Sequence, residues 1–246
     1  MRAKMKLFVY RIYQWLIATP LVIVASILFA GLTCIGALIS RNHWAHYMGV
    51  AWGWTWCTLM LVRVKVVRSP LAKKDTSYVF VANHQSAYDI FSIYGFLGYQ
   101  YKWMMRKALA NIPFVGWACR AAGHILVDTK TAAGIKATIA DAEKKLQGGV
   151  SLVVFPEGRR TDTGKMGPFK SGAFRLAVEF GLPIVPVTID GAYRVMPRST
   201  FNVTPGLITL TVHDPIFPAD DGFDIVQVSR DCRAAIQSAL PENERD

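Results

Sequence analysis

The stretch YVFVANHQSAYD, residues 78–89, joins a strand to the start of a helix and carries two side chains that can move protons. Residues 78–82 form a short apolar run bounded by polar residues, which is typical of a buried strand. His84 follows this strand, and Asp89 stands five residues later, where a helix-like run begins. A carboxylate on one ring nitrogen of a histidine fixes the tautomer and stabilises the protonated ring. Because no serine or cysteine nucleophile motif accompanies the pair, the sequence predicts a histidine base that acts directly on a substrate hydroxyl.

From Arg63 onward, the chain alternates between strand-like and helix-like runs. Strands are expected at 62–67, 78–82, 100–105, 123–127, 150–155, 184–189 and 207–213, and helices at 86–97, 131–147, 171–180 and 223–240. The strand runs are rich in Val and Ile with little alternation, which indicates that both faces of the sheet are covered. The sequence therefore predicts an α/β fold with a mixed, mainly parallel sheet of about seven strands flanked by helices.

In such a sheet, ligands bind at the edge formed by the carboxyl ends of the strands. His84 is expected at this edge. Asp89 also fits a purely structural role, because Ser86-x-x-Asp89 resembles a capping box at the start of the helix. The sequence favours the acid–base pair, since a cap alone does not account for His84.

A second motif, FPEGRRT at residues 155–161, follows another buried-strand run. Arg159, Arg160 and Thr161 place several hydrogen-bond donors in one loop, which suits a phosphate group. Gly158 lets the backbone approach a ligand closely. Two structural roles without a ligand stay open for this motif. The arginines could be solvated surface residues, and Glu157 could form a salt bridge that tethers a loop or helix.

Charge and composition narrow the choice of partner. The 246-residue chain has a formal net charge of +11 and is 52% hydrophobic but only 18% charged, which excludes a disordered chain. The positive charge predicts an anionic partner, and its position beside apolar segments favours a membrane and argues against nucleic acid. The four cysteines, Cys34, Cys57, Cys119 and Cys232, lie far apart without metal-ligand spacing, so we expect no disulfide framework, metal site or cofactor.

The N-terminal part of the chain contains a long uncharged segment. No charged residue lies between Arg11 and Arg41, and residues 15–39 are almost wholly apolar. As a helix this segment would measure about 37 Å, which exceeds the hydrocarbon core of about 30 Å. Pro20 is expected to kink the helix near its start. A cleaved signal peptide is the alternative, but the apolar stretch is too long for one.

A second apolar segment, 47–62, reaches only about 24 Å as a helix, which is marginal for a straight span. Its tryptophans suit an interfacial helix. Basic residues precede the first segment and follow the second, so both ends are expected in the cytoplasm. The sequence therefore predicts a membrane hairpin at 1–68, which spans the bilayer or dips into one leaflet, and an α/β domain at 69–246.

Together, the two motifs resemble those of the glycerolipid acyltransferase family, and most closely the 1-acylglycerol-3-phosphate acyltransferases, which carry a His-x4-Asp and a Phe-Pro-Glu-Gly motif in this order. The resemblance extends over about residues 75–215. It implies that His84 is the catalytic base and that Asp89 orients it. Arg160 then matches the phosphate-binding arginine of the family, and Glu157 matches a glutamate with a role in substrate binding and site integrity.

The sequence also departs from the family pattern at two places. Arg159 stands where the family usually has threonine. After Asp128, where the family usually has a second phosphate-binding arginine, Thr129 and Lys130 stand instead. A lysine there would act only as a point charge. A third block, residues 107–116, resembles the Lys-x5-Pro-x2-Gly segment of the family and makes Lys107 a candidate substrate-binding residue.

The resemblance implies transfer of a fatty acyl group from acyl-coenzyme A or acyl carrier protein to the 2-hydroxyl of 1-acylglycerol 3-phosphate. The product is phosphatidic acid, and the expected place is the cytoplasmic face of the inner membrane. A backbone N–H near Gly158 is expected to stabilise the oxyanion. The alternatives are an acyltransferase for another lysolipid, such as a lysophospholipid or lyso-ornithine lipid, and a catalytically inactive lipid-binding protein. A metal-dependent hydrolase would need more ligands than the motifs supply.

Overall fold

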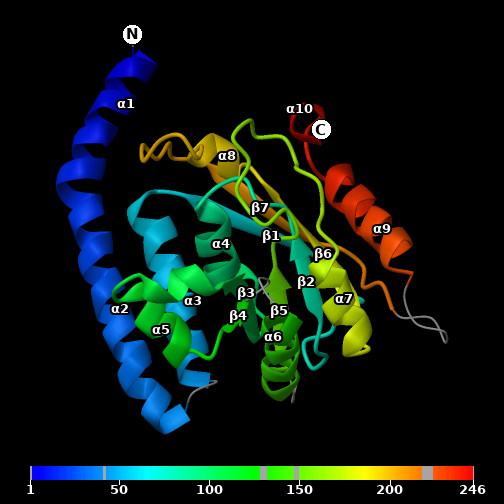
Figure 1. Ribbon diagram of the computed structural model, residues 1–246. Coiled ribbons are helices and arrows are strands. Elements are labelled where there is room, and N and C mark those ends of the chain that lie inside the picture. Colours follow the sequence, from blue (N-terminus) through cyan, green and yellow to red (C-terminus); the bar gives the residue numbers. More distant parts are fainter. Residues whose placement is uncertain (1, 41–42, 128–131, 147–149, 218–223, 246) are drawn as a thin grey trace.

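The strands form one mixed sheet in the order β1-β7-β6-β2-β5-β3-β4 (Figure 1). The computed structural model describes residues 2–40, 43–127, 132–146, 150–217 and 224–245. Within these residues the strands are β1 (Arg63–Arg68), β2 (Val79–Ala82), β3 (Tyr101–Arg106), β4 (Ile125–Val127), β5 (Ser151–Val154), β6 (Ile184–Asp190) and β7 (Leu207–Val212). The predicted α/β fold with a seven-stranded, mainly parallel sheet is confirmed.

β2 lies in the middle of the sheet and pairs in parallel with β5 on one side and β6 on the other. β3 and β4 continue the parallel set beyond β5. β7 runs antiparallel to β6, and β1 runs parallel to β7, so the direction changes at one side of the sheet. The carboxyl ends of β2, β5 and β3 therefore share one edge, where the loops that follow them can form a site.

Helices cover both faces of the sheet (Figure 1). One face is covered by α2 (Thr19–Ser40), α3 (His43–Leu59) and α4 (Tyr88–Phe96), and the other by α6 (Ala132–Lys145), α7 (Gly172–Glu179) and α9 (Ile225–Ser238). Along β2, Phe80 belongs to the first core, and Val79 and Val81 belong to the second. Both sides of the strand are buried, which explains why its sequence lacks polar alternation.

The four helices predicted after Arg63 correspond to α4, α6, α7 and α9. The structure adds three short helices that were not predicted, α5 (Val115–Ala121), α8 (Ala192–Val195) and α10 (Glu242–Arg245), and the 3₁₀ turn η2 (Lys107–Asn111). One or two helical turns are too short to display a periodic apolar pattern.

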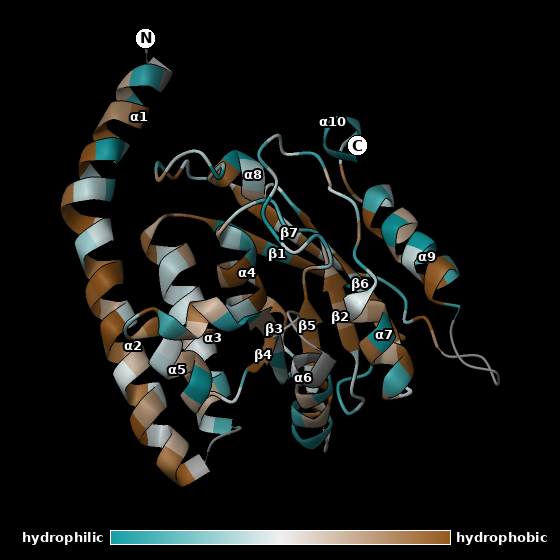
Figure 2. Cartoon of the chain, viewed as in Figure 1, coloured by the Kyte–Doolittle hydropathy of each residue, from teal (hydrophilic) through white to brown (hydrophobic). Residues whose placement is uncertain are grey.

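One long helix begins the chain. It consists of α1 (Arg2–Tyr13), the π-helical turn η1 (Gln14–Ala18) and α2 (Thr19–Ser40), and it starts well before the predicted segment 15–39. Among the described residues, Lys4–Ile39 is the one helix long and apolar enough to cross a membrane. Figure 2 shows that hydrophobic residues occupy long stretches of this helix. The π turn ends two residues before Pro20, whose ring disrupts regular helix bonding in the preceding turn, so the helix adjusts there and continues.

The second apolar segment packs back onto the domain. α3 contacts both α2 and α4. Trp52 and Trp56, expected at a membrane interface, point inward instead, and both donate to Ser26 Oγ, at 2.9 and 3.1 Å. Trp56 also stacks on Phe91 of α4. α3 therefore helps to cover the sheet. Residues 63–68, at the end of the predicted hairpin, form β1, and the division of the chain at residue 68 stays a prediction.

The contact between α3 and α4 depends on glycine. A Cβ on Gly53 would lie 2.6 Å from the carbonyl oxygen of Phe91 and 2.7 Å from the amide nitrogen of Gly95. Because both neighbours are backbone atoms, no side-chain movement relieves the overlap. The two helices would have to separate to admit even a methyl group.

We expect Gly53→Ala to lower the free energy of unfolding by about 1–3 kcal/mol, the usual cost of overpacking a core. Thermal or denaturant unfolding of the purified protein in detergent measures the change. Gly172→Ala, at the start of α7, is the matched control, because a Cβ there would meet no atom within 4 Å. Equal unfolding midpoints for the two variants would contradict the close helix contact.

Candidate active site

The centre of the candidate site is a single carboxylate oxygen. Asp89 Oδ2 lies 2.8 Å from His84 Nδ1 and accepts hydrogen bonds from the backbone N–H groups of Gln85, at 2.6 Å, and Ser86, at 2.8 Å. Asp89 is fully buried, whereas 13% of the His84 side chain is exposed. Three donors converge on one buried acceptor, which offsets the cost of removing the carboxylate from water.

The two roles considered for Asp89 coexist. Its carboxylate accepts from the Ser86 N–H, and Ser86 Oγ accepts from the Tyr88 N–H at 3.1 Å, so the side chains organise the first turn of α4. The same oxygen faces His84. The position of the Asp89 carboxylate therefore lets it both bind the backbone at the start of α4 and orient the ring of His84.

The imidazole of His84 is held by Asp89 at its edge and by an aromatic side chain at its face. It stacks on Phe155, with ring centroids 3.9 Å apart and planes 5° apart, and Phe155 in turn packs against Trp103. Since Asp89 Oδ2 is the acceptor for Nδ1, that nitrogen carries the hydrogen and Nε2 carries the free lone pair. The geometry leaves Nε2 as the proton-accepting atom of the pair.

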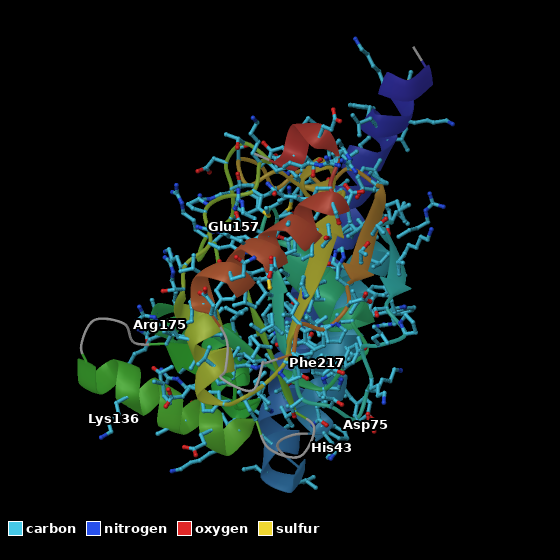
Figure 3. The ribbon with its side chains drawn as sticks, turned by 90° about the vertical axis from the view of Figure 1, so that its right-hand side faces the viewer. His43, Asp75, Lys136, Glu157, Arg175 and Phe217 are labelled. Carbon is cyan, nitrogen blue, oxygen red and sulfur yellow. The ribbon has the colours of Figure 1, made fainter. Side chains whose placement is uncertain are left out.

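Glu157 fastens the second motif to the first. Its Oε1 accepts from the backbone N–H of His84 at 2.7 Å, and its Oε2 accepts from that of Gly167 at 2.8 Å. These are backbone contacts, so the tether is not the salt bridge considered from the sequence. Burial raises the pKa of the Glu157 carboxyl to about 7, although both backbone bonds and Arg233 lower it. In Figure 3, Glu157 lies in the upper half of the molecule and Asp75, which precedes β2, lies in the lower half.

Gly158 occupies a backbone conformation that other residues avoid. Its φ is +73°, and a Cβ there would lie 2.9 Å from Lys170 Nζ. Its N–H donates to the carbonyl oxygen of Phe155 at 3.0 Å within a turn. This N–H is therefore engaged within the turn, and an oxyanion-stabilising N–H near Gly158 stays a prediction. Its carbonyl oxygen accepts from Arg106 Nη2 at 2.7 Å.

The rest of the second motif lies beside His84. The Thr161 N–H donates to the carbonyl oxygen of His84 at 3.0 Å. Arg198 donates to the Arg160 carbonyl oxygen at 3.1 Å and forms an ion pair with Asp162 at 3.0 Å, which steadies the loop from outside. Arg159 is exposed and Arg160 is half-buried. The structure thus brings residues 157–161 to the same sheet edge as His84.

Two predicted residues, Lys107 and Lys130, remain to be placed. Lys107 is exposed at the start of η2, directly after the carboxyl end of β3. Lys130 lies outside the described residues. Sequence reasoning missed Arg106, although its place as the last residue of β3 puts it at the shared edge beside the Gly158 loop.

A cluster formed by the C-terminal helix was also missed. Gln85 Nε2 donates to the carbonyl oxygen of Gly164 at 2.6 Å and to Glu244 Oε2 at 3.2 Å. Arg194 donates to the other oxygen of Glu244 at 2.5 Å. α10 therefore supports the residue next to His84. No local pattern in the sequence connects positions so far apart.

Two other histidines, His124 and His213, make hydrogen bonds within the fold. His124 is buried, with Nε2 2.6 Å from the Tyr94 hydroxyl and Nδ1 accepting from the Trp103 N–H at 3.2 Å. Burial lowers its pKa to about 3. His213 lies 2.8 Å from the Thr188 hydroxyl. In the part of the chain that the structure describes, no three His, Cys, Asp or Glu side chains are grouped to hold a metal ion.

The raised pKa of Glu157 makes stability depend on pH. The folded protein keeps a proton on this carboxyl up to about pH 7, while the unfolded chain releases it near 4.5, so stability falls as pH rises through this range. We expect the unfolding midpoint of the wild type to decrease relative to that of Glu157→Gln between about pH 5 and pH 8. Thermal unfolding in detergent over this range measures it.

Glu179→Gln, at the exposed end of α7, is the control for removal of a carboxylate. Its unfolding midpoint should not diverge from that of the wild type over the same pH range. A constant difference between wild type and Glu157→Gln would contradict a buried carboxyl that loses its proton near pH 7.

Comparison with known proteins places this site in a family. The chain is 27% identical over 244 residues to the 1-acyl-sn-glycerol-3-phosphate acyltransferase of Salmonella typhimurium, covering 98% of this chain and 96% of the relative. It is 34% identical over 151 residues to the chloroplastic 1-acyl-sn-glycerol-3-phosphate acyltransferase BAT2 of Brassica napus. That match covers 60% of this chain and 43% of the relative, so the chain spans less than half of the chloroplast protein.

A solved structure shows the same architecture. The fold matches the crystal structure of the 1-acyl-sn-glycerophosphate (LPA) acyltransferase PlsC from Thermotoga maritima with a TM-score of 0.76 and 28% identity, over 96% of this chain and 95% of that one. The acyltransferase family model matches residues 63–190, more than half of the chain and both motifs. The resemblance carried by the two motifs is thereby confirmed, and the chain belongs to the acyltransferase family.

Proposed function

We propose that the protein transfers a fatty acyl group from a thioester to the 2-hydroxyl of 1-acylglycerol 3-phosphate and so forms phosphatidic acid. The observation that carries this proposal is the His84–Asp89 pair, with its 2.8 Å contact, at the carboxyl edge of β2. Full-length relatives named as 1-acyl-sn-glycerol-3-phosphate acyltransferases support the choice of acceptor.

In this proposal His84 is the general base. Its Nε2 accepts the proton of the 2-hydroxyl, whose oxygen attacks the thioester carbonyl carbon to give a tetrahedral oxyanion. The carbon–sulfur bond then breaks, and the protonated imidazole returns its proton to the departing thiolate. General base catalysis of this kind contributes about 10²- to 10⁴-fold. No acyl-enzyme forms, because the acceptor hydroxyl is itself the nucleophile.

Asp89 is the positioning residue for this base. Its Oδ2 holds Nδ1–H of the ring and two backbone N–H groups of the same loop, so the ring keeps one tautomer and one orientation. When the ring becomes an imidazolium, the adjacent carboxylate stabilises the positive charge. The stack on Phe155 prevents rotation out of the carboxylate plane.

Basic side chains around the sheet edge would bind the 3-phosphate. Arg160 is the main candidate, because its loop is fixed to His84 through Thr161 and to Arg198 through its own carbonyl oxygen. A guanidinium matches a phosphate group with two parallel hydrogen bonds. Arg159 and Lys107 add positive charge nearby, and Lys130 is proposed as a further point charge.

The substrate and the anchor define the place of the reaction. The apolar helix Lys4–Ile39 associates the protein with a membrane. We place the catalytic domain at the cytoplasmic face of the inner membrane, since basic residues flank the apolar segments. The donor is acyl-coenzyme A or acyl carrier protein, and both are anionic, which fits the net charge of +11.

The direct test is acyl transfer by the purified protein in detergent, with lysophosphatidic acid and a panel of other lysolipids as acceptors and both thioesters as donors. We expect the wild type to prefer lysophosphatidic acid and His84→Ala to lose at least about 10²-fold in kcat. His43→Ala, a histidine exposed at the other end of the molecule (Figure 3), is the control. Preference for a phosphate-free or choline-type lysolipid would overturn the acceptor assignment, and an active His84→Ala would overturn the mechanism.

We expect Arg160→Gln to raise the KM for lysophosphatidic acid about 10- to 100-fold with a smaller change in kcat, because binding to the phosphate is lost in ground state and transition state alike. Steady-state kinetics with varied acceptor measures it. Arg175→Gln removes an exposed arginine from α7 and should leave both constants unchanged. An unchanged KM in Arg160→Gln would remove this residue from the phosphate site.

A further inference from the structure

A short segment beside the candidate site exposes an unusual amount of apolar surface. Its η2 turn and α5 helix follow β3 directly. Five large apolar side chains of the segment are 42–56% exposed: Leu109, Ile112, Phe114, Val115 and Trp117. No acidic residue occurs between Asp89 and Asp128, while Lys107 and Arg120 are basic and exposed. An apolar patch of this kind, with basic residues around it, marks an interaction surface.

The backbone holds these side chains outward in a fixed turn. Phe114 has a φ of +61°, in a region that non-glycine residues seldom adopt, and its ring meets that of Trp117 edge-on with centroids 5.2 Å apart. Gly116 allows the turn to close, because a Cβ there would lie 2.1 Å from the carbonyl oxygen of Ala110. Strain at an exposed aromatic residue persists only when the surrounding structure maintains it.

The segment lies against the membrane helix. α5 packs on α2 (Figures 1 and 2), and α2 exposes long apolar side chains such as Leu28 and Ile35, which are 57% and 63% exposed. The exposed apolar side chains of the two helices therefore lie on neighbouring elements. A lipid layer that receives α2 would meet α5 next.

We propose that η2 and α5 form a second membrane contact, seated in the headgroup region of an anionic phospholipid bilayer. Phe114 and Trp117 enter the boundary between headgroups and acyl chains, where aromatic residues concentrate. Arg120 faces the lipid phosphates at the rim. A soluble acidic partner is a less suitable occupant. Because the segment is adjacent to α2, such a partner would compete with lipid for the same surface.

This contact has a consequence for the site. The segment begins directly after Arg106, which donates to Gly158 in the loop beside His84. Seating α5 in the headgroups therefore holds the candidate site at the depth where a lysolipid phosphate lies. The proposal concerns membrane contact and does not require the acceptor to be lysophosphatidic acid.

The test places an environment-sensitive NBD label on Trp117→Cys in a full-length background of Cys34→Ala and Cys119→Ala, since Cys57 and Cys232 are buried. Arg175→Cys on α7, on the other side of the sheet, carries the control label (Figure 1). Both proteins are reconstituted into vesicles of equal parts phosphatidylcholine and phosphatidylglycerol, with and without doxyl-labelled lipid. We expect blue-shifted, lipid-quenched emission at position 117 and water-like, unquenched emission at position 175.

Water-like emission at position 117 in a correctly folded protein would overturn the proposal. Phe114→Cys, labelled in the same way, repeats the measurement if the first variant does not fold. Two other occupants are tested in parallel. A dimer in detergent that Trp117→Ser abolishes would assign the surface to a second copy, and protection of the label by added acyl carrier protein would assign it to that donor; either result overturns the membrane assignment.

A functional measurement adds a second, independent criterion. We expect Val115→Ser combined with Trp117→Ser to match the wild type on substrate dispersed in detergent. The same variant should lose at least about tenfold in kcat/KM on long-chain substrate embedded in the vesicles, because less apolar surface enters the lipid. Equal loss in detergent and in vesicles would indicate damage to the site and contradict the proposal.

Discussion

The buried carboxylate of Asp89 is the interaction on which the rest of the site depends. It accepts from His84 Nδ1 and from two successive backbone N–H groups, so it fixes the loop after β2, the first turn of α4 and the ring of His84 at once. A carboxylate without these donors would be costly to bury. The loop therefore has one favourable conformation, in which the ring of His84 is already oriented.

The order of the strands extends this constraint to residues distant in sequence. Asn83 exchanges two hydrogen bonds with the backbone of Ile189 in β6, at 2.8 and 2.9 Å. On the other side, Glu157 from the loop after β5 accepts from the His84 N–H, and the Thr161 N–H donates to the His84 carbonyl oxygen. His84 is thus fixed by both neighbours of β2. Two motifs about 70 residues apart act together only because β2 and β5 are adjacent and parallel.

The sequence predicts the strands well because both faces of the sheet are buried, which leaves short runs of Val and Ile between polar loops. It also predicts where most residues of the candidate site lie, since His84 and residues 157–161 come soon after β2 and β5, and Asp89 lies in the helix that follows β2. It does not reveal strand order, so the contact between Arg106 and the Gly158 loop was missed. It does not reveal polar contacts between distant segments either, and Glu244 therefore carried no signal although it touches Gln85.

Polar contacts attach the first half of the N-terminal helix to the α/β domain, which the hydropathy of the helix alone does not predict. Gln14, in the π turn, accepts from the Val203 N–H at 3.2 Å and donates to the Phe201 carbonyl oxygen at 2.9 Å, and Arg11 also bonds Val203. These contacts fasten the first half of the helix to the loop that carries Arg198, which in turn holds the Arg160 loop. A glutamine within an apolar helix is tolerated because both ends of its amide are bonded. α2 has 22 residues and a length of about 33 Å, enough to cross the hydrocarbon core of a bilayer. The contacts of the π turn therefore connect this apolar helix to the loop that holds Arg160.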